Sequence, residues 1–394
     1  MIKHQSKIEK LIIMHCPKGV EFKEIGEICQ INRGRVMSKD YLRNNLGEYP
    51  VYSSQTGNEG IFGHIKTYDY DGEYVTWTTD GANAGSVFYH NGKFSITNVC
   101  GLLKPKENVL NTKYLLYSLG VVAKSYVNAG MGNPKLMSNV MEKIKIPIPP
   151  LPVQEEIVKI LNSFAELEAE LEAELEERDK QYKHYRLRLL TFGEKVKRLP
   201  LEEVFNFKNG YTPSKANIEY WTNGTIPWFR MDDIRENGCV LNDSLQHVNE
   251  VAVKGKRLFP ANSIIVATSA TIGEHALVTV PHLSNQRFVS LSIKPKFQDK
   301  INIKFIHYYF YLLDVWCIQN VTKSSFASVD MTGFRKFPIP IVDIKEQEKI
   351  ILVLDKLNAL VNDISIGLPA ELKARRQQYE YYRDKLLTFK EYVS

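Results

Sequence analysis

Two stretches of the chain place apolar residues three and four positions apart, which is the spacing of one face of a long helix. In the first stretch these positions, two of them charged, are Ile157, Ile160, Phe164, Leu167, Leu171, Glu174, Arg178, Tyr182, Tyr185, Leu189 and Phe192. In the second they are Ile350, Val353, Leu357, Leu360, Ile364, Tyr379, Tyr382, Leu386 and Phe389. The pattern predicts two long helices that form an antiparallel coiled coil. Proline should break the second helix at Gly367-Leu368-Pro369.

The segments before the two helical stretches alternate β-branched or aromatic residues with polar ones, as half-buried strands do. Residues 48–53, 73–78 and 86–90 show this alternation, and residues 114–124 have the pattern of a short amphipathic helix. The later segment repeats the plan, with Ile226-Pro227-Trp228-Phe229 parallel to residues 49–52, Asn285 parallel to Asn98, and residues 305–313 parallel to the helix at 114–124. We therefore predict an α+β fold, with two mixed α/β domains joined by two long helices and related by an internal pseudo-two-fold.

The two helical stretches also begin and end on the same short sequences, which indicates an internal duplication. Proline-rich segments, 147–152 and 338–340, precede Gln154 and Gln347, and both stretches end on Leu-Leu-Thr-Phe. These prolines should hold the chain extended as it enters each helix. The expected parts are an N-terminal segment at 1–19 packed on the end of the coil, mixed domains at 20–145 and 194–336, and a proline-rich lead-in with its helix at 146–193 and 337–394.

The charge of the chain is unevenly distributed. The formal net charge is +6, with +2 over residues 20–150, +5 over residues 194–345 and −4 over residues 151–193. This suits mixed domains that face an anion and a first helix that faces protein or solvent. A chance imbalance is the alternative.

Motifs of catalysis are missing from the sequence. It contains no phosphate-binding loop of the P-loop type, no His-Glu-x-x-His pair and no Gly-x-Ser-x-Gly elbow. The Gly-rich sequence at 80–85 lacks the spacing of a dinucleotide fingerprint. Five scattered cysteines and no apolar run of membrane-spanning length favour a reduced, cytoplasmic protein. We expect no enzymatic activity, metal or cofactor in this chain.

The duplicated unit resembles the specificity subunit of type I restriction-modification systems, the HsdS family, over essentially the whole chain. The resemblance rests on Pro-Ile-Pro, Gln-Glu, the helical stretch, Gln-Tyr, Tyr-Arg and Leu-Leu-Thr-Phe, in that order and twice. It implies two target recognition domains that each read one half of a bipartite DNA sequence. It implies helices that set the distance between the half-sites and bind two modification (methyltransferase) subunits. Restriction (endonuclease and translocase) subunits are implied too, so S-adenosylmethionine, ATP and Mg²⁺ are expected on partner chains.

Base recognition needs polar side chains on loops, with basic groups nearby for the phosphates. The DNA-binding candidates are Arg33, Arg35, Ser54, Gln55, Thr79, Asn83 and Lys135 in the first domain, and Lys208, Asn209, Arg230, Ser269, Thr271, Gln286, Arg287, Lys323 and Ser324 in the second. Many of these residue types are also common in ordinary turns. The candidates for binding a partner subunit are Pro147, Pro149, Gln154, Tyr182, Tyr185, Pro338, Pro340, Gln347, Tyr379 and Tyr382.

Three other functions fit parts of the pattern. A subunit of a methylation-only or related system would have the same architecture. A coiled-coil scaffold with two protein-binding domains would have no DNA affinity, and an enzyme with an unrecognised site would turn over a substrate by itself.

Overall fold

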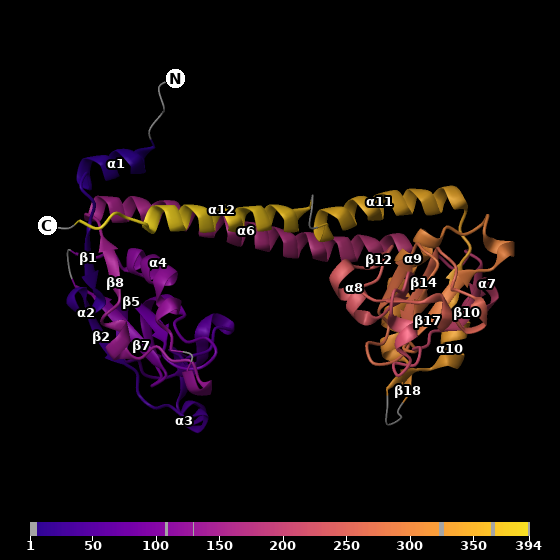
Figure 1. The fold of residues 1–394 in the computed structure, drawn as a ribbon, viewed down its shortest axis with the longest axis horizontal. Helices are drawn as coiled ribbons and strands as arrows, with labels where there is room; N and C mark the ends of the chain where they lie inside the picture. Colours follow the sequence, from indigo (N-terminus) through magenta and orange to yellow (C-terminus); the bar gives the residue numbers. More distant parts are fainter. Residues whose placement is uncertain (1–5, 107–108, 129, 323–326, 364–366, 393–394) are drawn as a thin grey trace, which may run out of the picture. The chain divides into compact units, whose positions relative to one another are not determined.

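The structure is a computed structural model that describes residues 6–106, 109–128, 130–322, 327–363 and 367–392. It consists of two compact units, one made of residues 1–172 and 371–394 and the other of residues 173–370. Each unit contains strands and helices (Figure 1), so the predicted α+β class is confirmed. The domain boundaries expected from the sequence stay predictions, because each unit also takes in the helices that pack on its mixed domain.

The first unit is built around a six-stranded sheet with the strand order β2-β7-β5-β6-β3-β4. These strands are β2 (Cys29–Arg33), β3 (Leu46–Tyr52), β4 (Ile61–Ile65), β5 (Tyr70–Thr78), β6 (Val87–Ile96) and β7 (Cys100–Pro105). A separate antiparallel pair joins β1 (Glu21–Glu24) to β8 (Lys145–Ile148). Neighbouring strands are antiparallel except β6 and β3, which pair in parallel.

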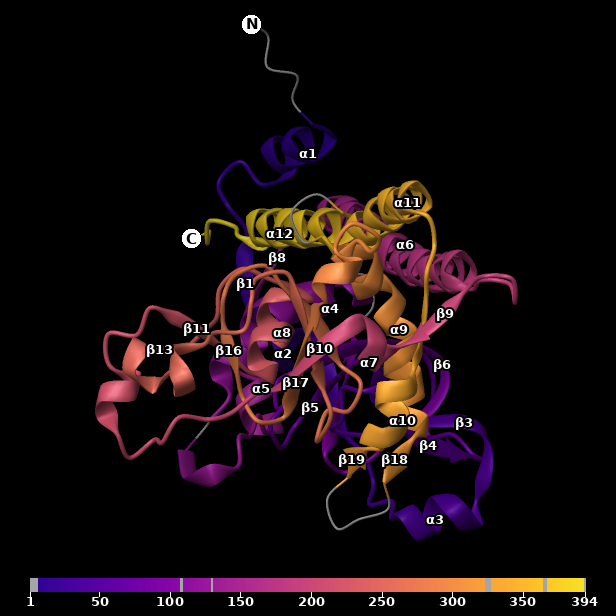
Figure 2. The ribbon, with the colours of Figure 1, turned by 90° about the vertical axis from the view of Figure 1, so that its right-hand side faces the viewer.

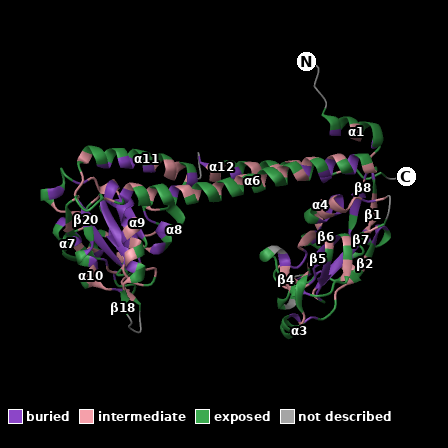
Figure 3. Ribbon diagram, turned by 180° about the vertical axis from the view of Figure 1, so that it is seen from behind, coloured by how far each residue is buried: buried purple, intermediate pink, exposed green. Residues whose placement is uncertain are grey.

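Helix α4 (Thr112–Val122) covers one face of this sheet and packs on β5 and β6. The fully buried rings of Trp77 and Tyr114 belong to the core between them, and the Trp77 indole donates to the carbonyl of Leu136 over 2.9 Å. The short helices α2 (Ile25–Ile28), α3 (Lys39–Asn44) and α5 (Ser138–Met141) complete the mixed domain. Figure 3 shows this buried interior in purple.

Three longer helices contribute to the same unit, namely α1 (Lys7–His15), the first half of α6 (Leu151–Leu190) and α12 (Leu368–Leu387). Helix α12 runs antiparallel to α6, because Phe164 contacts Tyr379 and Tyr382 whereas Glu168, farther along α6, pairs with Arg376. Helix α1 lies at the beginning of α6, where Lys7 forms an ion pair with Glu156. The segment after α12 returns to the beginning of the mixed domain, since the N–H of Tyr392 donates to the carbonyl of Val20 over 2.8 Å.

The second unit contains a five-stranded sheet with the order β10-β17-β14-β15-β12 and a three-stranded sheet with the order β13-β11-β16. The strands of the larger sheet are β10 (Phe205–Asn209), β12 (Val240–Leu241), β14 (Ser263–Ala267), β15 (His275–Val278) and β17 (Phe288–Ile293). Those of the smaller sheet are β11 (Ile226–Phe229), β13 (His247–Val248) and β16 (Leu283–Ser284). Two further antiparallel pairs join β9 (Arg198–Pro200) to β20 (Pro338–Pro340) and β18 (Val321–Thr322) to β19 (Ser328–Val329).

Helix α9 (Ile303–Gln319) covers the larger sheet of this unit and packs on β14 and β15. Figure 1 shows α9 beside β14, and Figure 2 shows it after a turn of 90° about the vertical axis. The other helices are α7 (Leu201–Val204), α8 (Met231–Asn237), α10 (Met331–Lys336), α11 (Ile344–Asn362) and the second half of α6. Tyr182 and Leu190 of α6 share a buried core with Ile350 and Leu354 of α11. The expected break in the second helical stretch lies between α11 and α12, although residues 364–366 are outside the described part.

The hydrogen bonds confirm that the two units repeat one plan. The N–H of Thr97 donates to the carbonyl of Tyr52 over 2.9 Å, and the N–H of Asn285 donates to the carbonyl of Phe229 over 3.0 Å. The predicted correspondence of residues 49–52 with 226–229 follows from these bonds. The correspondence of Asn285 with Asn98 was wrong by one position, because Asn285 takes the place of Thr97.

The buried stripe on α6 departs from the expected one. Leu167 and Tyr185 are 44% and 45% exposed, and the charged positions Glu174 and Arg178 are exposed as well. Leu161, Leu175, Arg186 and Leu190 are buried or half-buried instead. A strict 3.5-residue spacing drifts by about 20° per heptad from a straight helix of 3.6 residues per turn, which explains the error.

The same drift occurs on α11, where Leu354 and Val361 are buried while the expected Val353 and Leu360 are exposed. The prolines were also misread at one position, because α6 already begins at Leu151 and holds Pro152 in its first turn. Proline has no backbone N–H group. It is tolerated there because the N–H groups of the first turn have no acceptor within the helix. Over the described residues, no helix has the length and apolar character to cross a membrane.

Candidate nucleic-acid interface

One edge of the six-stranded sheet gathers several candidate residues of the first unit. Strand β2 ends at Arg33, which pairs with Gly101, and β5 ends at Thr78, which pairs with Cys100 at the beginning of β7. The loops at this edge therefore contain residues 79–86, 97–99, 128 and 130–135. We call this end of the strands, with its three loops, the first loop edge.

Arg33 holds the first loop edge together. Its Nη2 donates to the carbonyl of Asn98 over 2.5 Å and to the Oγ1 of Thr79 over 3.2 Å. The Thr79 hydroxyl in turn donates to the Asp80 carboxylate over 2.6 Å, and Lys135 lies 3.9 Å from that carboxylate. Thr79 is fully buried, and its role in DNA binding stays a prediction. A charge-assisted network of this kind stiffens the loops that it connects.

The other candidates of the first unit are exposed or half-buried. Arg35 donates from Nε to Asp69 over 3.0 Å and from Nη1 to the hydroxyl of Tyr41 over 3.2 Å. These two hydrogen bonds, that to Tyr41 first, raise the pKa of the Arg35 guanidinium, so it stays charged. Gln55 is exposed and Ser54 and Asn83 are half-buried. All of them stay DNA-binding predictions, as does the exposed Lys135.

The second unit forms the same edge in the larger of its two sheets. Strand β10 ends at Asn209, which pairs with Val289, and β14 ends at Ala267, which pairs with Phe288 at the beginning of β17. We call this edge, with the loop residues 268–274, 285–287, 320–322 and 327–330, the second loop edge. Residues 323–326 are outside the described part, so the predictions for Lys323 and Ser324 lie outside it too.

Two pairs of backbone hydrogen bonds show that the loop edges are equivalent. The N–H of Thr79 donates to the carbonyl of Val99 over 3.1 Å, and the N–H of Thr268 donates to that of Arg287 over 2.9 Å. The carbonyl of Thr79 accepts from the N–H of Leu136, and the carbonyl of Thr268 accepts from that of Val329, each over 2.9 Å. The side chains on this shared frame differ, since Arg33 corresponds to Asn209 and Lys135 to Ser328.

The described candidates of the second unit are exposed or half-buried. Arg287, Gln286, Lys208 and Asn209 are exposed, and Ser269, Thr271 and Arg230 are half-buried. Lys208 lies 4.9 Å from the centre of the Phe259 ring, and burial, with the nearby charge of Arg257, lowers its pKa. The Nε of Arg230 is buried without a hydrogen-bond partner within the described structure. These residues stay DNA-binding predictions as well.

Sequence reasoning missed how the first loop edge is held in place. Asp80 receives the Thr79 hydroxyl and faces Lys135, while Asn98 offers its carbonyl to Arg33. The Thr-Thr-Asp sequence at 78–80 was the available signal, but the contacts with Arg33 and Lys135 join residues that are distant in the sequence. Among the described residues, no group of three or more His, Cys, Asp and Glu side chains could hold a metal ion.

Most residues expected to bind a partner subunit are buried in their own unit. Those with buried side chains are Pro147, Pro149, Gln154, Tyr182, Pro340 and Gln347, and their role in partner binding stays a prediction. Tyr379 and Tyr382 are half-buried beside Phe164 of α6. Tyr185, at 45% exposure, and the exposed Pro338 stay partner-binding predictions.

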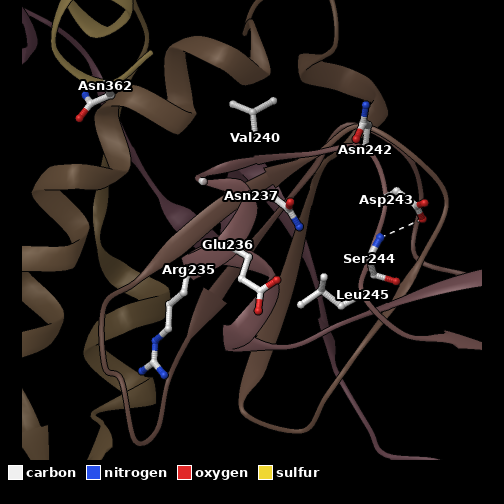
Figure 4. Close-up of a pocket in the computed structure, with 10 residues that line it drawn as sticks. Arg235, Glu236, Asn237, Val240, Asn242, Asp243, Ser244, Leu245 and Asn362 are labelled. Carbon is white, nitrogen blue, oxygen red and sulfur yellow. Dashed lines mark hydrogen bonds between the residues drawn. The ribbon is translucent and has the colours of Figure 1, made fainter. Parts of the chain in front are cut away.

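The second unit also has a hollow of about 740 Å³ beside the end of α8 (Figure 4). Arg235, Glu236, Asn242 and Asp243 are among the residues around it, and the N–H of Ser244 donates to the Asp243 carboxylate over 2.8 Å. Arg235, Glu236 and Asp243 are exposed, so water already solvates their charges. An open hollow of this kind, without convergent buried polar groups, does not have the character of a ligand site.

Comparison with known proteins places this architecture in context. The model of the type I restriction modification DNA specificity domain matches the chain twice, at residues 17–177 and 193–374. The putative type I specificity subunit S.MpnORF507P of Mycoplasma pneumoniae is 34% identical over 92% of this chain and 96% of its own length. The type I restriction enzyme EcoprrI specificity subunit of Escherichia coli is 56% identical, but the alignment spans 52% of this chain and only 53% of that protein.

Solved structures share the fold. The S subunit of a type I restriction-modification system from M. genitalium has a TM-score of 0.53 and 16% identity, covering 94% of this chain and 96% of that one. A chain from a study of complex assembly and conformational transition of the type I R-M system has a TM-score of 0.63 and 14% identity, covering 94% and 98%. At these identities the likeness concerns the fold alone.

Proposed function

Because the chain belongs to the type I restriction-modification DNA specificity family, we propose that its two loop edges each read one half of a bipartite DNA target. The chain is a specificity subunit, and specificity subunits of these systems are non-catalytic. Sequence recognition by this chain would therefore direct chemistry that other subunits carry out.

The observation that carries the proposal is one backbone frame with two sets of side chains. The equivalent bonds at Thr79 and Thr268 hold the same loops in the same way. On that frame the first loop edge presents Lys135 and the second presents Gln286 and Arg287. Donors and acceptors on loops discriminate base edges in the major groove, so different side chains on one frame favour two different half-sites.

The exposed residues divide into two chemical roles. Lys135, Lys208 and Arg287 carry charges that suit phosphate oxygens, which position a protein on DNA without reading its sequence. Gln55, Asn209 and Gln286 are exposed amides that suit adenine, and Arg35 and Arg287 have the forked geometry that suits guanine. Arg33 acts through the loops that it connects and is a positioning residue.

We further propose that the helices bind two modification subunits and that restriction subunits join the same complex. Apolar side chains exposed on the helices support a docking role, namely Tyr185 and Leu187 on α6 and Leu352, Val353 and Leu360 on α11. S-adenosylmethionine, ATP and Mg²⁺ would then be bound by the partner chains.

The test is the methylation pattern of a host that carries the system. Single-molecule sequencing should reveal one bipartite methylated sequence that disappears when this chain is deleted and returns when it is restored. The chain purified with its partners should bind a duplex of that sequence and methylate it only when S-adenosylmethionine is added. No sequence preference in binding would overturn the proposal and favour a scaffold, and methyl transfer by the isolated chain would favour an enzyme.

A further inference from the structure

Ala270 lies in the second loop edge with an unfavourable backbone conformation. Its φ is +66°, in the left-handed region that the Cβ atom of an L-residue disfavours. The residue is exposed, so no buried contact of its methyl group offsets this cost. The loop around it is fixed by the bond from Thr268 to Arg287 and by a bridge between Ser269 and Ser328. Ala270 is therefore held in place by a defined loop base.

The first loop edge has glycine at the equivalent position. Thr79 corresponds to Thr268 and Asp80 to Ser269, so Gly81, with a φ of +91°, corresponds to Ala270. A Cβ atom built on Gly81 would meet nothing within 4 Å, which means that this position faces open space. Glycine would satisfy the same backbone in the second loop without strain. The methyl group of Ala270 is the only chemical difference that alanine introduces there.

A second unfavourable feature follows directly in the chain. The hydroxyl of Thr271 is buried and has no hydrogen-bond partner within the described structure. A buried polar group without a partner costs free energy, and such groups, like strained backbone, concentrate at functional sites. The positive φ of Ala270 and the unpaired hydroxyl of Thr271 both reduce stability, so their presence in neighbouring residues indicates that this loop has a function.

We propose that Ala270 is a specificity-determining residue whose methyl group contacts the 5-methyl group of a thymine in the half-site read by the second unit. This proposal rests on the proposed function, because it assigns a base contact at the same loop edge. The neighbouring Thr268, Ser269 and Arg287 each carry a polar group, whereas the side chain of Ala270 is a methyl group alone. Apolar contact from alanine is one of the ways in which proteins distinguish thymine in the major groove.

The experiment pairs a methyl deletion in the protein with a methyl deletion in the DNA. The full chain, purified with the subunits that accompany it, is titrated with duplexes of its methylated sequence in which single thymines of the second half-site are replaced by deoxyuridine. For the natural protein, one replacement should weaken binding about 3- to 5-fold, the equivalent of one buried methyl group. For Ala270→Gly, the same replacement should change nothing, and the thymine duplex should bind as weakly as the uridine duplex binds to the natural protein.

Ala270→Gly should also raise the melting temperature by about 2 °C, because it removes the strain, so loss of folding does not confuse the result. Ala82→Gly is the matched control, since Ala82 is exposed in the first loop edge and has no positive φ. It should neither stabilise the protein nor alter the response of the second half-site. If every uridine duplex binds the natural protein normally, or no thymine occurs in the second half-site, Ala270 does not read a methyl group although the proposed function stands. Absence of any sequence preference would overturn both.

Discussion

The side chain of Gln154, in the first turn of α6, accepts a hydrogen bond from the backbone N–H of Asn111 over 2.8 Å. Asn111 is the N-cap of α4, so this bond connects the beginning of one helix to the beginning of another. The Nε2 of Gln154 donates to the carbonyls of Val109 and Pro149 over 3.0 Å and 2.7 Å. The fully buried amide thus ties the loop before α4, the proline-rich segment and α6 to one another.

Gln347 makes the same three bonds in the second unit. Its Oε1 accepts from the N–H of Asn302, the N-cap of α9, over 2.9 Å, and its Nε2 donates to the carbonyls of Lys300 and Val342 over 2.8 Å each. In each unit, the glutamine therefore fixes the direction in which a long helix leaves its mixed domain. This shared structural role accounts for the glutamine that recurs after each proline-rich segment.

Replacing Gln154 with alanine should destabilise the first unit by about 3 kcal/mol. The substitution leaves one backbone N–H and two carbonyls without partners in a buried place, and each unpaired group costs about 1–3 kcal/mol before any relaxation. Gln347→Ala should have a similar effect on the second unit. Chemical denaturation of the full chain, followed by hydrogen exchange to locate the loss, measures both.

Gln377→Ala is the matched control for these variants, because Gln377 is exposed on α12. Exposed substitutions of this kind usually change the free energy of unfolding by less than about 0.5 kcal/mol. Equal stability of Gln154→Ala and the control would mean that the buried amide is not a structural connection.

Removing a charge from one loop edge should impair recognition of one half-site and leave the other unaffected. Lys135→Ala should weaken recognition through the first half-site, and Arg287→Ala should weaken it through the second. A lost base contact costs about 1–3 kcal/mol for the cognate base. A lost phosphate contact weakens binding to all sequences and reduces the slope of the logarithm of the binding constant against that of the salt concentration by about one. Binding to duplexes with one half-site scrambled, at several salt concentrations, distinguishes the two roles.

Lys373→Ala removes the same charge from the exposed face of α12 and should leave the preference for both half-sites intact. The division of labour between the units would be wrong if Lys135→Ala and Arg287→Ala each impaired both half-sites to the same degree.

The duplication was the part of this fold that the sequence predicted best. Residues 226–229 were matched to 49–52 because their Ile-Pro-Trp-Phe and Tyr-Pro-Val-Tyr patterns are local, and the strand pairing confirms the match. Asn285 was matched one position too far along the first copy, because the turn before β17 reveals its register only through the bond to Phe229. Leu167 and Tyr185 were placed on the buried stripe because a heptad repeat, with about 3.5 residues per turn, was assumed. The buried face of α6 instead follows a straight helix with about 3.6 residues per turn.

The candidate interface was less accessible to sequence reasoning. Arg33 has the residue type of a base-reading side chain and ends strand β2, and only its bonds to Asn98 and Thr79 reveal that it holds loops together. Gln154 likewise had a strong signal as part of a repeated sequence. The signal identified an important residue, but its burial and its partners are long-range facts that the local pattern does not contain.

Acid should destabilise both units through buried histidines. Burial lowers the pKa of His90 to about 4, and burial likewise lowers the pKa of His282 to about 4. The unfolded chain binds these protons near pH 6.5, so each contribution to stability is complete above pH 6.5 and is lost as the pH falls toward 4. The loss for one such histidine is at most about 3 kcal/mol.

His90→Gln should flatten this dependence in the first unit, because glutamine does not titrate and can replace the hydrogen bond with Thr76. Denaturation midpoints between pH 4 and 7.5 measure the difference, and the exposed His64→Gln is the control. An unchanged slope for His90→Gln would show that other groups cause the acid sensitivity.

Lengthening α6 should change the spacing between the half-sites, since this helix runs without a break from Leu151 to Leu190 and contributes to both units. Inserting Glu-Ala-Glu-Leu after Leu171 would lie between Glu168 and Glu172, which both pair with Arg376, and would disturb those contacts. The better position is between Glu172 and Ala173, where the two units divide. Four helical residues add about 6 Å, and base pairs rise about 3.4 Å each, so we expect one or two more unspecified bases between unchanged half-sites.

The second helical stretch already tolerates four more residues than the first, and its interruption lies between Asn362 and Leu368. The matched control variant should therefore receive the same four residues after Gly367, between α11 and α12, where the added residues do not lengthen either helix. Methylome sequencing of hosts carrying each variant gives the answer. A longer gap for the insertion in α6 and the natural gap for the insertion after Gly367 are expected. The natural gap with full activity in both would mean that the length of α6 does not set the distance between half-sites.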